Sequence, residues 1–98
     1  MYKIVYTKQA LKDLENLKRN GISNKAKILV DVIRENPYQN PPSYEKLVGN
    51  LDGILSRRIN IQHRLVYQVY AEPHVIDGVE CEGTVKIIRM WTHYDGLS

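Results

Sequence analysis

The 98-residue sequence has one cysteine, no phenylalanine and no long apolar run. Because Cys81 is alone, an internal disulfide is impossible, which is consistent with a reducing cytosol. No stretch reads as a membrane span, and the N-terminus does not read as a signal peptide, so we expect a cytoplasmic protein without a membrane segment. We find no repeats and no low-complexity tract. The length predicts one domain over residues 1–98.

Close pairs of metal ligands are also missing. His63, His74, His93 and Cys81 lack the paired spacing that is typical of zinc sites, so we predict no metal and no cofactor. The net charge is +3 and the pI is about 9.0. This mildly basic balance is compatible with nucleic-acid contact but does not require it. Seven tyrosines offer rings that stack and hydroxyls that hydrogen-bond.

Hydrophobic periodicity predicts an α+β fold of order β-α-α-β-β-β. The predicted elements are a strand at 2–6, helices at 8–20 and 24–35, and strands at 55–59, 63–70 and 84–92. We expect Thr7 and Ser23 to be the helix N-caps. A link this short predicts an antiparallel helix pair, packed on one face of a mainly antiparallel sheet. The charged helix residues, Asp13 among them, could form a basic patch, but for any one of them we expect a solvated face.

Two longer connections interrupt this pattern. Residues 37–50 form an irregular stretch with three prolines, and long loops in compact domains are often functional. Residues 71–83 read as an extended hairpin loop with a short strand at 75–76.

Arginines mark the hairpin of the two central strands. Alternation of side chains places Arg58 and Arg64 on one face, whereas Arg57 shares the apolar face with Leu55 and Tyr67. Three arginines within eight residues favour a surface that holds an anion, because the planar guanidinium binds phosphate oxygens in pairs.

The predicted topology lets Glu45, Arg58, Arg64, His93 and Tyr94 meet. A carboxylate, an imidazole and arginines are sufficient for acid–base cleavage of a phosphodiester without a metal. Each residue also has an ordinary structural interpretation, as a loop acid, a paired strand arginine or an exposed histidine. The candidate catalytic residues are Glu45, Arg64, His93 and Tyr94, and the candidate RNA contacts are Arg57, Arg58, Arg89 and Trp91.

Several short motifs resemble one known family. They are Glu-Lys-Leu at 45–47, Asn-Leu-Asp-Gly at 50–53, Ser-Arg-Arg-Ile at 56–59, His-Arg-Leu-Val-Tyr at 63–67 and His-Tyr at 93–94. In this order and spacing, the chain resembles the YoeB (Txe) toxins of the RelE superfamily over almost its whole length. It departs from the family at Val48, in the longer 71–83 segment and in four residues after Tyr94.

The resemblance implies a toxin of a type II toxin–antitoxin system that cuts mRNA in the ribosomal A site. It implies a YefM-like antitoxin partner and a homodimer. By position, Glu45 resembles the general base, Arg64 the phosphate-stabilising arginine and Arg58 a supporting one. His93 resembles the general acid, and Tyr94 the aromatic residue that positions the nucleotide.

Two other interpretations stay open. A non-catalytic interaction protein could use the same basic face to bind RNA or a topoisomerase, but it would have no need for an acid–base pair. A ribonuclease that acts without the ribosome is the second, although a single catalytic histidine on a small site favours help from an external scaffold.

Overall fold

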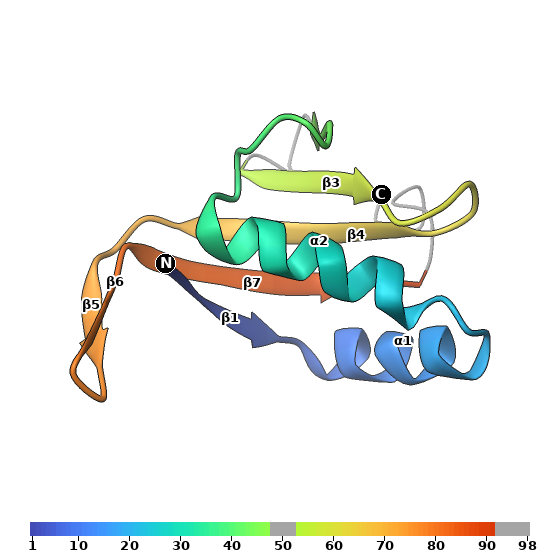
Figure 1. Cartoon of the computed structure of the whole chain (residues 1–98), viewed down its shortest axis with the longest axis horizontal. Helices are drawn as coiled ribbons and strands as arrows, with labels where there is room; N and C mark the ends of the chain where they lie inside the picture. The colour runs from blue at the N-terminus through green and yellow to red at the C-terminus, as the bar shows by residue number, and fades with distance from the viewer. Residues whose placement is uncertain (48–52, 92–98) are drawn as a thin grey trace.

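The computed structural model describes residues 1–47 and 53–91 (Figure 1). The elements are β1 (Tyr2–Tyr6), α1 (Lys8–Arg19), α2 (Ser23–Glu35), β2 (Glu45–Lys46), β3 (Ile54–Arg58), β4 (Arg64–Tyr70), β5 (His74–Ile76), β6 (Val79–Cys81) and β7 (Gly83–Arg89). The α+β architecture predicted from the sequence is confirmed. Among the described helices, none has both the length and the apolar character to cross a membrane.

Five strands form the main sheet, in the order β1-β7-β4-β3-β2. β2, β3, β4 and β7 pair antiparallel, whereas β1 pairs parallel with β7. The sheet is therefore mostly antiparallel, as expected, with one parallel pair at the N-terminal edge. β2 forms the other edge and has only two residues.

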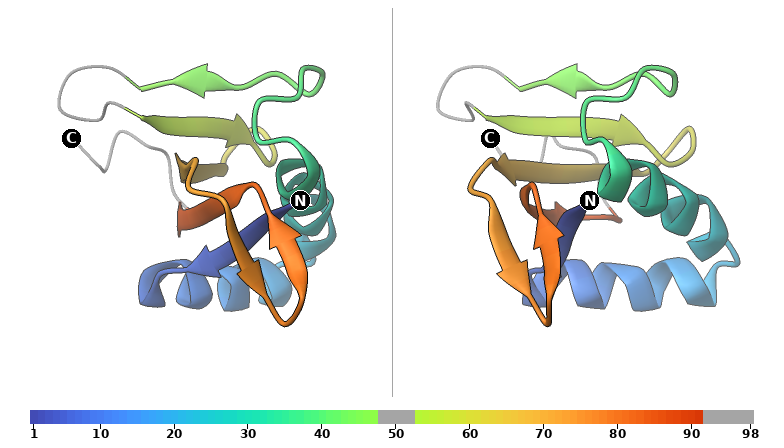
Figure 2. Two further views of the ribbon diagram at one scale, coloured as in Figure 1. Left: turned by 90° about the vertical axis from the view of Figure 1, so that its left-hand side faces the viewer. Right: turned by 60° about the vertical axis from the view of Figure 1, so that its left-hand side comes forward.

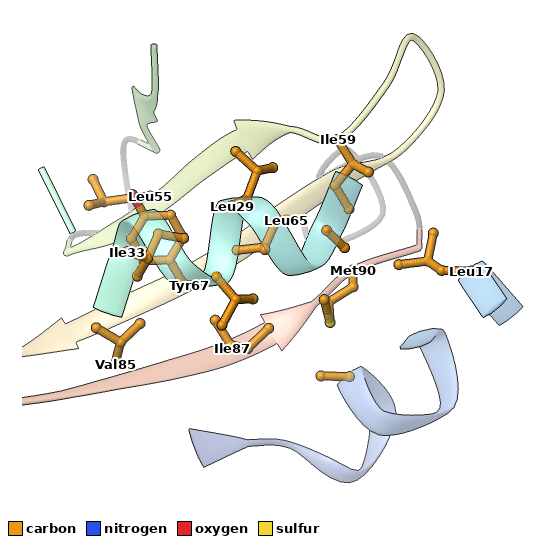
Figure 3. Packing of buried hydrophobic residues seen from close by; sticks show 13 residues of the cluster. Leu17, Leu29, Ile33, Leu55, Ile59, Leu65, Tyr67, Val85, Ile87 and Met90 are labelled. Carbon is orange, nitrogen blue, oxygen red and sulfur yellow. The ribbon is translucent and has the colours of Figure 1, made fainter. Parts of the chain in front are cut away.

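Both helices contribute to one core on one side of the sheet. In Figure 1, α1 continues from the end of β1 towards the right of the view, and α2 runs back across the sheet. Leu29 and Ile33 of α2 pack with Leu65 and Ile87 of the central strands (Figure 3). Leu17 of α1 belongs to the same buried cluster. Burial of this apolar area is the main force that holds helices and sheet together.

The two helix starts differ from each other. Thr7 caps α1 as predicted, since its Oγ1 accepts from the Ala10 N–H at 3.0 Å and donates to the Ile88 carbonyl at 2.9 Å. The expectation that Ser23 caps α2 is wrong. Ser23 is the first helical residue, and Ile22 occupies the cap position without a side-chain hydrogen bond.

A β-bulge re-aims the end of β7. Tyr67 pairs with Ile87 but Val66 pairs with Arg89, which leaves Ile88 as an extra residue. Bulges bend a strand and change the direction of the side chains that follow. Arg89 consequently shares the register of Val66, and the next residue, Met90, returns to the core. The strand predicted to run to residue 92 ends at Arg89.

The 71–83 connection contains a separate two-stranded hairpin, β5–β6, that projects from the main sheet (Figure 2). Its turn is Asp77-Gly78, both with positive φ, of 50° and 81°. The predicted short strand at 75–76 is confirmed, and β6 was missed. The Asp-Gly pair between β-branched residues was the available signal, because it favours the type I′ hairpin turn.

Candidate functional site

Arg64 is positioned by the two central strands. Its Cα lies opposite that of Arg58 in the β3–β4 pair. The Arg64 Nε donates to the Ser56 hydroxyl at 2.6 Å, and the residue is only 8% exposed. Ser56 itself is fully buried, so it offers a fixed acceptor. The guanidinium of Arg64 is therefore held in one orientation, whereas Arg58 is exposed.

Glu45 joins the two arginines from the edge strand β2. Its Cα pairs with that of Ser56, and its Oε2 lies 3.6 Å from Arg64 Nη2. The Glu45 side chain is 57% exposed, so it stays accessible to a ligand. Ser43, Tyr44, Glu45, Arg58 and Arg64 line a hollow of about 300 Å³. The structure thus brings together three of the predicted site residues, Glu45, Arg58 and Arg64, beside one hollow.

His93 and Tyr94 lie outside the described residues, so their roles stay predictions. Trp91 is the last described residue, and its ring stacks on His63 with centroids 4.0 Å apart and planes 19° apart. His63 directly precedes Arg64. This stack anchors the end of the described chain next to the start of β4.

Arg57 requires a correction. We expected it to contact RNA, but the residue is fully buried. Its guanidinium donates to the Tyr67 hydroxyl at 2.9 Å and to backbone carbonyls of the loop before β2. Strand alternation had placed Arg57 on the apolar face, and this placement is what the structure shows. An arginine buried in this way has no surface to offer to RNA, so we do not count it among the RNA contacts.

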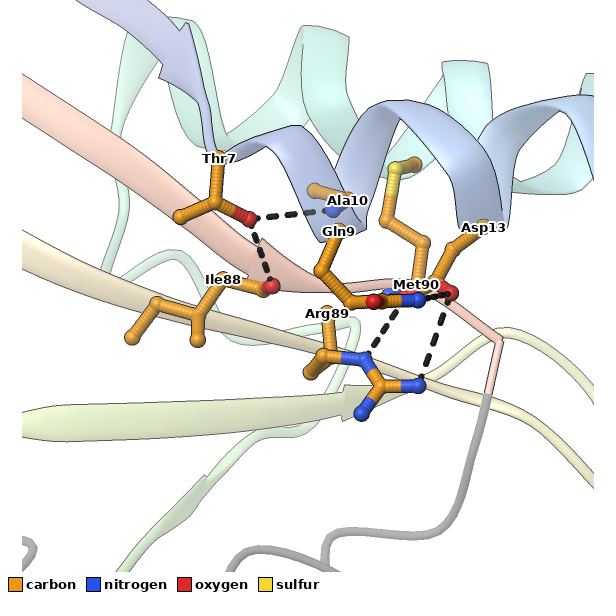
Figure 4. A network of polar contacts seen from close by, with 7 residues as sticks. All are labelled: Thr7, Gln9, Ala10, Asp13, Ile88, Arg89 and Met90. Atoms are coloured by element: carbon orange, nitrogen blue, oxygen red, sulfur yellow. Dashed lines mark hydrogen bonds and ion pairs between the residues drawn. The ribbon is translucent and has the colours of Figure 1, made fainter.

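Arg89 is engaged by a buried carboxylate. Its Nε donates to Asp13 at 2.8 Å, and the Met90 N–H donates to the same oxygen at 3.0 Å (Figure 4). Asp13 is fully buried, so the expectation of a solvated Asp13 is wrong. Burial by itself raises the pKa of the Asp13 carboxyl. Hydrogen bonds from Arg89, Met90 and Gln9 outweigh it, and the pKa falls below its ordinary value.

Sequence reasoning missed Ser56, Asp13 and Tyr67 as residues that hold the arginines. Ser56 could have been found from the alternation of β3, which places it beside Arg58 on the same face. Across residues 1–47 and 53–91, no group of three or more His, Cys, Asp or Glu side chains is arranged to hold a metal ion.

The fold is that of the RelE/YoeB-like bacterial toxins. The chain resembles the YoeB/ParE toxin from Agrobacterium tumefaciens with a TM-score of 0.77 and 26% identity, over 94% of this chain and 99% of that one. For the YoeB–YefM complex from Staphylococcus aureus, the TM-score is 0.69 and the identity 32%, over 96% and 99%. The dimer of the same toxin gives 0.70 and 31%, over 95% and 98%.

Sequence comparison specifies the family. The model of YoeB-like toxins of bacterial type II toxin–antitoxin systems matches residues 6–94. The Toxin YoeB of Synechocystis is 33% identical over 69 residues, which is 68% of this chain and 80% of that protein. The chain therefore belongs to the YoeB-like toxins, a family known as ribonucleases.

Proposed function

We propose that this toxin cuts mRNA in the A site of the bacterial ribosome and so stops translation in the cytoplasm. The observation that carries the proposal is the placement of Glu45 and Arg64 in one hollow, with Arg64 oriented by Ser56. A proton acceptor 3.6 Å from a fixed cation is the pair that an attack on a phosphodiester requires.

In the proposed reaction, Glu45 takes the proton from the ribose 2′-hydroxyl. The 2′-oxygen then attacks the adjacent phosphorus and forms a bond to it, while the bond to the 5′-oxygen breaks. Arg64, supported by Arg58, stabilises the negative charge that develops on the phosphate oxygens. His93 protonates the leaving 5′-oxygen, and Tyr94 positions the nucleotide. The products are a 2′,3′-cyclic phosphate and a 5′-hydroxyl, and the scheme uses only side chains of this chain.

We further propose a YefM-like antitoxin and a homodimer for this chain. The toxin from S. aureus, 32% identical, was crystallised with YefM and also as a dimer. An antitoxin that covers the Arg58–Arg64 hollow would silence the toxin directly. The proposal therefore expects the purified complex to be inactive and the released toxin to be active.

Cleavage of a defined mRNA, with and without programmed ribosomes, tests the proposal. We expect cuts only with ribosomes and 5′-hydroxyl ends at the cut. Arg64→Ala should slow single-turnover cleavage on the order of a hundredfold or more, because it removes a preorganised phosphate contact. Arg34→Ala is the matched control, since Arg34 is a surface arginine of α2 that pairs with Asp31. It should cut like the wild type.

The product ends are the decisive measurement. A 5′-phosphate would mean that water attacked, and the roles of Glu45 and His93 would then have to be withdrawn. Binding to ribosomes without any cut would favour the non-catalytic interaction protein. Cleavage of naked mRNA at an equal rate would favour the ribosome-independent ribonuclease.

A further inference from the structure

Arg57 is the centre of a buried hydrogen-bond network on the core side of β3. Its Nη2 donates to the carbonyls of Pro37 and Gln39 at 3.1 and 2.9 Å, and its Nη1 donates to that of Pro42. Its Nε donates to the Tyr67 hydroxyl, which in turn donates to the Pro37 carbonyl at 2.7 Å. We call Arg57, Tyr67 and these three carbonyls the Arg57 clasp.

The Arg57 clasp holds the loop that leads to Glu45. Residues 36–44 join α2 to β2, and every carbonyl in the clasp belongs to this loop. The Tyr44 ring, directly before Glu45, lies with its centroid 5.1 Å from the Arg57 guanidinium carbon. A cation over an aromatic face is a favourable contact. Arg57 therefore contacts the segment before Glu45 in two ways, through the backbone carbonyls of the loop and through the ring of Tyr44.

The backbone pairing of the edge strand β2 is short. In the described part of the chain, it pairs with β3 through two residues, Glu45 with Ser56 and Lys46 with Leu55. One further backbone bond, from the Leu47 N–H to the Ile54 carbonyl, continues this pairing. A two-residue strand at a sheet edge is weakly determined by its ladder alone. The position of Glu45 thus depends also on its contact with Arg64 and on the loop that precedes it.

Burying the guanidinium of Arg57 costs free energy, and packing alone does not explain why an arginine occupies this position. A buried guanidinium loses its hydration and must have its donors satisfied. Within the described residues, Arg57 makes no ion pair with a carboxylate, and its partners are neutral oxygens. Well-packed apolar residues often stabilise a core as much as buried charged groups. What an apolar side chain cannot do is fix three carbonyls of one loop at the same time.

We infer that Arg57 is a positioning residue for Glu45. One strand, β3, sets both halves of the site: Ser56 orients Arg64 on one face, and Arg57 fixes the approach to Glu45 on the other. This inference rests on the proposed function, because it gives Glu45 a role in cleavage. It predicts that loosening the clasp harms cleavage only through Glu45.

Two variants loosen the clasp to different degrees. Arg57→Lys leaves a single nitrogen in place of three, and Tyr67→Phe removes only the hydroxyl between Arg57 and Pro37. Matched controls are Arg34→Lys and Tyr70→Phe, whose side chains bond to Asp31 and Gln68 at the surface. Amide hydrogen exchange of the 43–47 peptide reports on β2 without any activity. We expect about tenfold faster exchange there in both clasp variants and no change in the controls.

Cleavage kinetics then separate positioning from stability. At saturating programmed ribosomes and well below the unfolding midpoint, each clasp variant should lower the single-turnover rate on the order of tenfold to a hundredfold. The half-saturating concentration should stay within about twofold, because Arg57 does not reach the surface. In a Glu45→Gln background, where cleavage is followed over hours, the same substitutions should lower the single-turnover rate by less than about threefold.

The outcomes distinguish the inference from the proposed function. Suppose that the wild type cuts normally and that the clasp variants lower the cleavage rate by the same factor with Glu45 and with Gln at position 45. This result would overturn the positioning role and leave the proposed function intact. Unchanged exchange of the 43–47 peptide in both clasp variants would also overturn it. No cleavage by the wild type on ribosomes would remove the proposed function, and with it the role of Glu45.

Discussion

Replacing Asp13 by asparagine tests how the end of β7 is held. Asp13 is fully buried and accepts from Arg89 Nε at 2.8 Å, the Met90 N–H at 3.0 Å and Gln9 Nε2 at 3.1 Å. Asparagine keeps the shape but removes the negative charge. Arg89 then remains beside a neutral group. Because asparagine has one acceptor oxygen instead of two, at least one of the three donors faces its NH₂ group or makes a weaker hydrogen bond.

The size of the effect follows from burial. Breaking a buried ion pair by removing one partner costs about 3–5 kcal/mol. The Arg89 side chain is 23% exposed, so water can restore part of its solvation. We therefore expect Asp13→Asn to lower the free energy of unfolding by about 2–3 kcal/mol. In urea, with a slope of about 1–1.5 kcal/mol per molar for a domain of this size, the midpoint should fall by roughly 2 M.

The matched control is Asp31→Asn. Asp31 pairs with Arg34 at 2.8 Å, but its side chain is 66% exposed, so the pair is solvated. Exposed pairs contribute about 0–0.5 kcal/mol. If the two variants unfold at urea midpoints within about 0.3 M of each other, the buried pair does not stabilise β7 in the way the structure indicates.

The same pair predicts a direction for the pH dependence. Because folding lowers the pKa of Asp13, the carboxylate stabilises the fold above its unfolded pKa, near 4. This contribution is lost as the pH falls from about 4 through the lower pKa of the folded state. The stability difference between the wild type and Asp13→Asn should thus be constant from about pH 5 to 7 and shrink below pH 4. A difference that grows in acid would contradict the lowered pKa.

Two further predictions concern β7 and the site. Gly83→Ala should lower the free energy of unfolding by about 1–3 kcal/mol in urea titrations, because a Cβ there would lie 2.3 Å from the Tyr70 carbonyl oxygen; unchanged stability would show that this contact relaxes easily. Ser56→Ala should leave the fold intact by circular dichroism but slow cleavage about tenfold, since Arg64 loses its fixed acceptor; full activity would mean that Arg64 needs no support from Ser56.

Local sequence patterns correctly predicted the features of the fold that depend on residues close together in the chain. β1, the start of α1 and the Thr7 cap follow from alternation, helical spacing and one hydroxyl at the correct position. The bulge at Ile88 could not be predicted, because it depends on how β7 meets β4 and α1. The burial of Asp13 has the same origin, since its partner Arg89 lies 76 residues further along the chain.

The arginines show where reasoning from residue type fails. Four of them, including Arg64, were expected to face an anion. Alternation alone placed Arg57 on the core face, but the phosphate chemistry of arginine favoured the surface interpretation. The partners of Arg57 are carbonyls of residues 37, 39 and 42, which no side-chain motif announces. Sequence motifs therefore do not identify a buried arginine whose partners are backbone oxygens.

The four arginines that we predicted to contact RNA or phosphate differ in their surroundings. The Arg57 guanidinium is buried and that of Arg89 pairs with the buried Asp13, which leaves Arg58 and Arg64, of these four, beside the hollow. These two residues lie directly opposite each other across β3 and β4, and like charges in that arrangement repel. Glu45, 3.6 Å from Arg64, offsets part of the repulsion. Under the proposed function, the phosphodiester of the substrate supplies the remaining negative charge. The repulsion between Arg58 and Arg64 thus lowers the stability of the free toxin, and the same two residues bind the transition state most strongly.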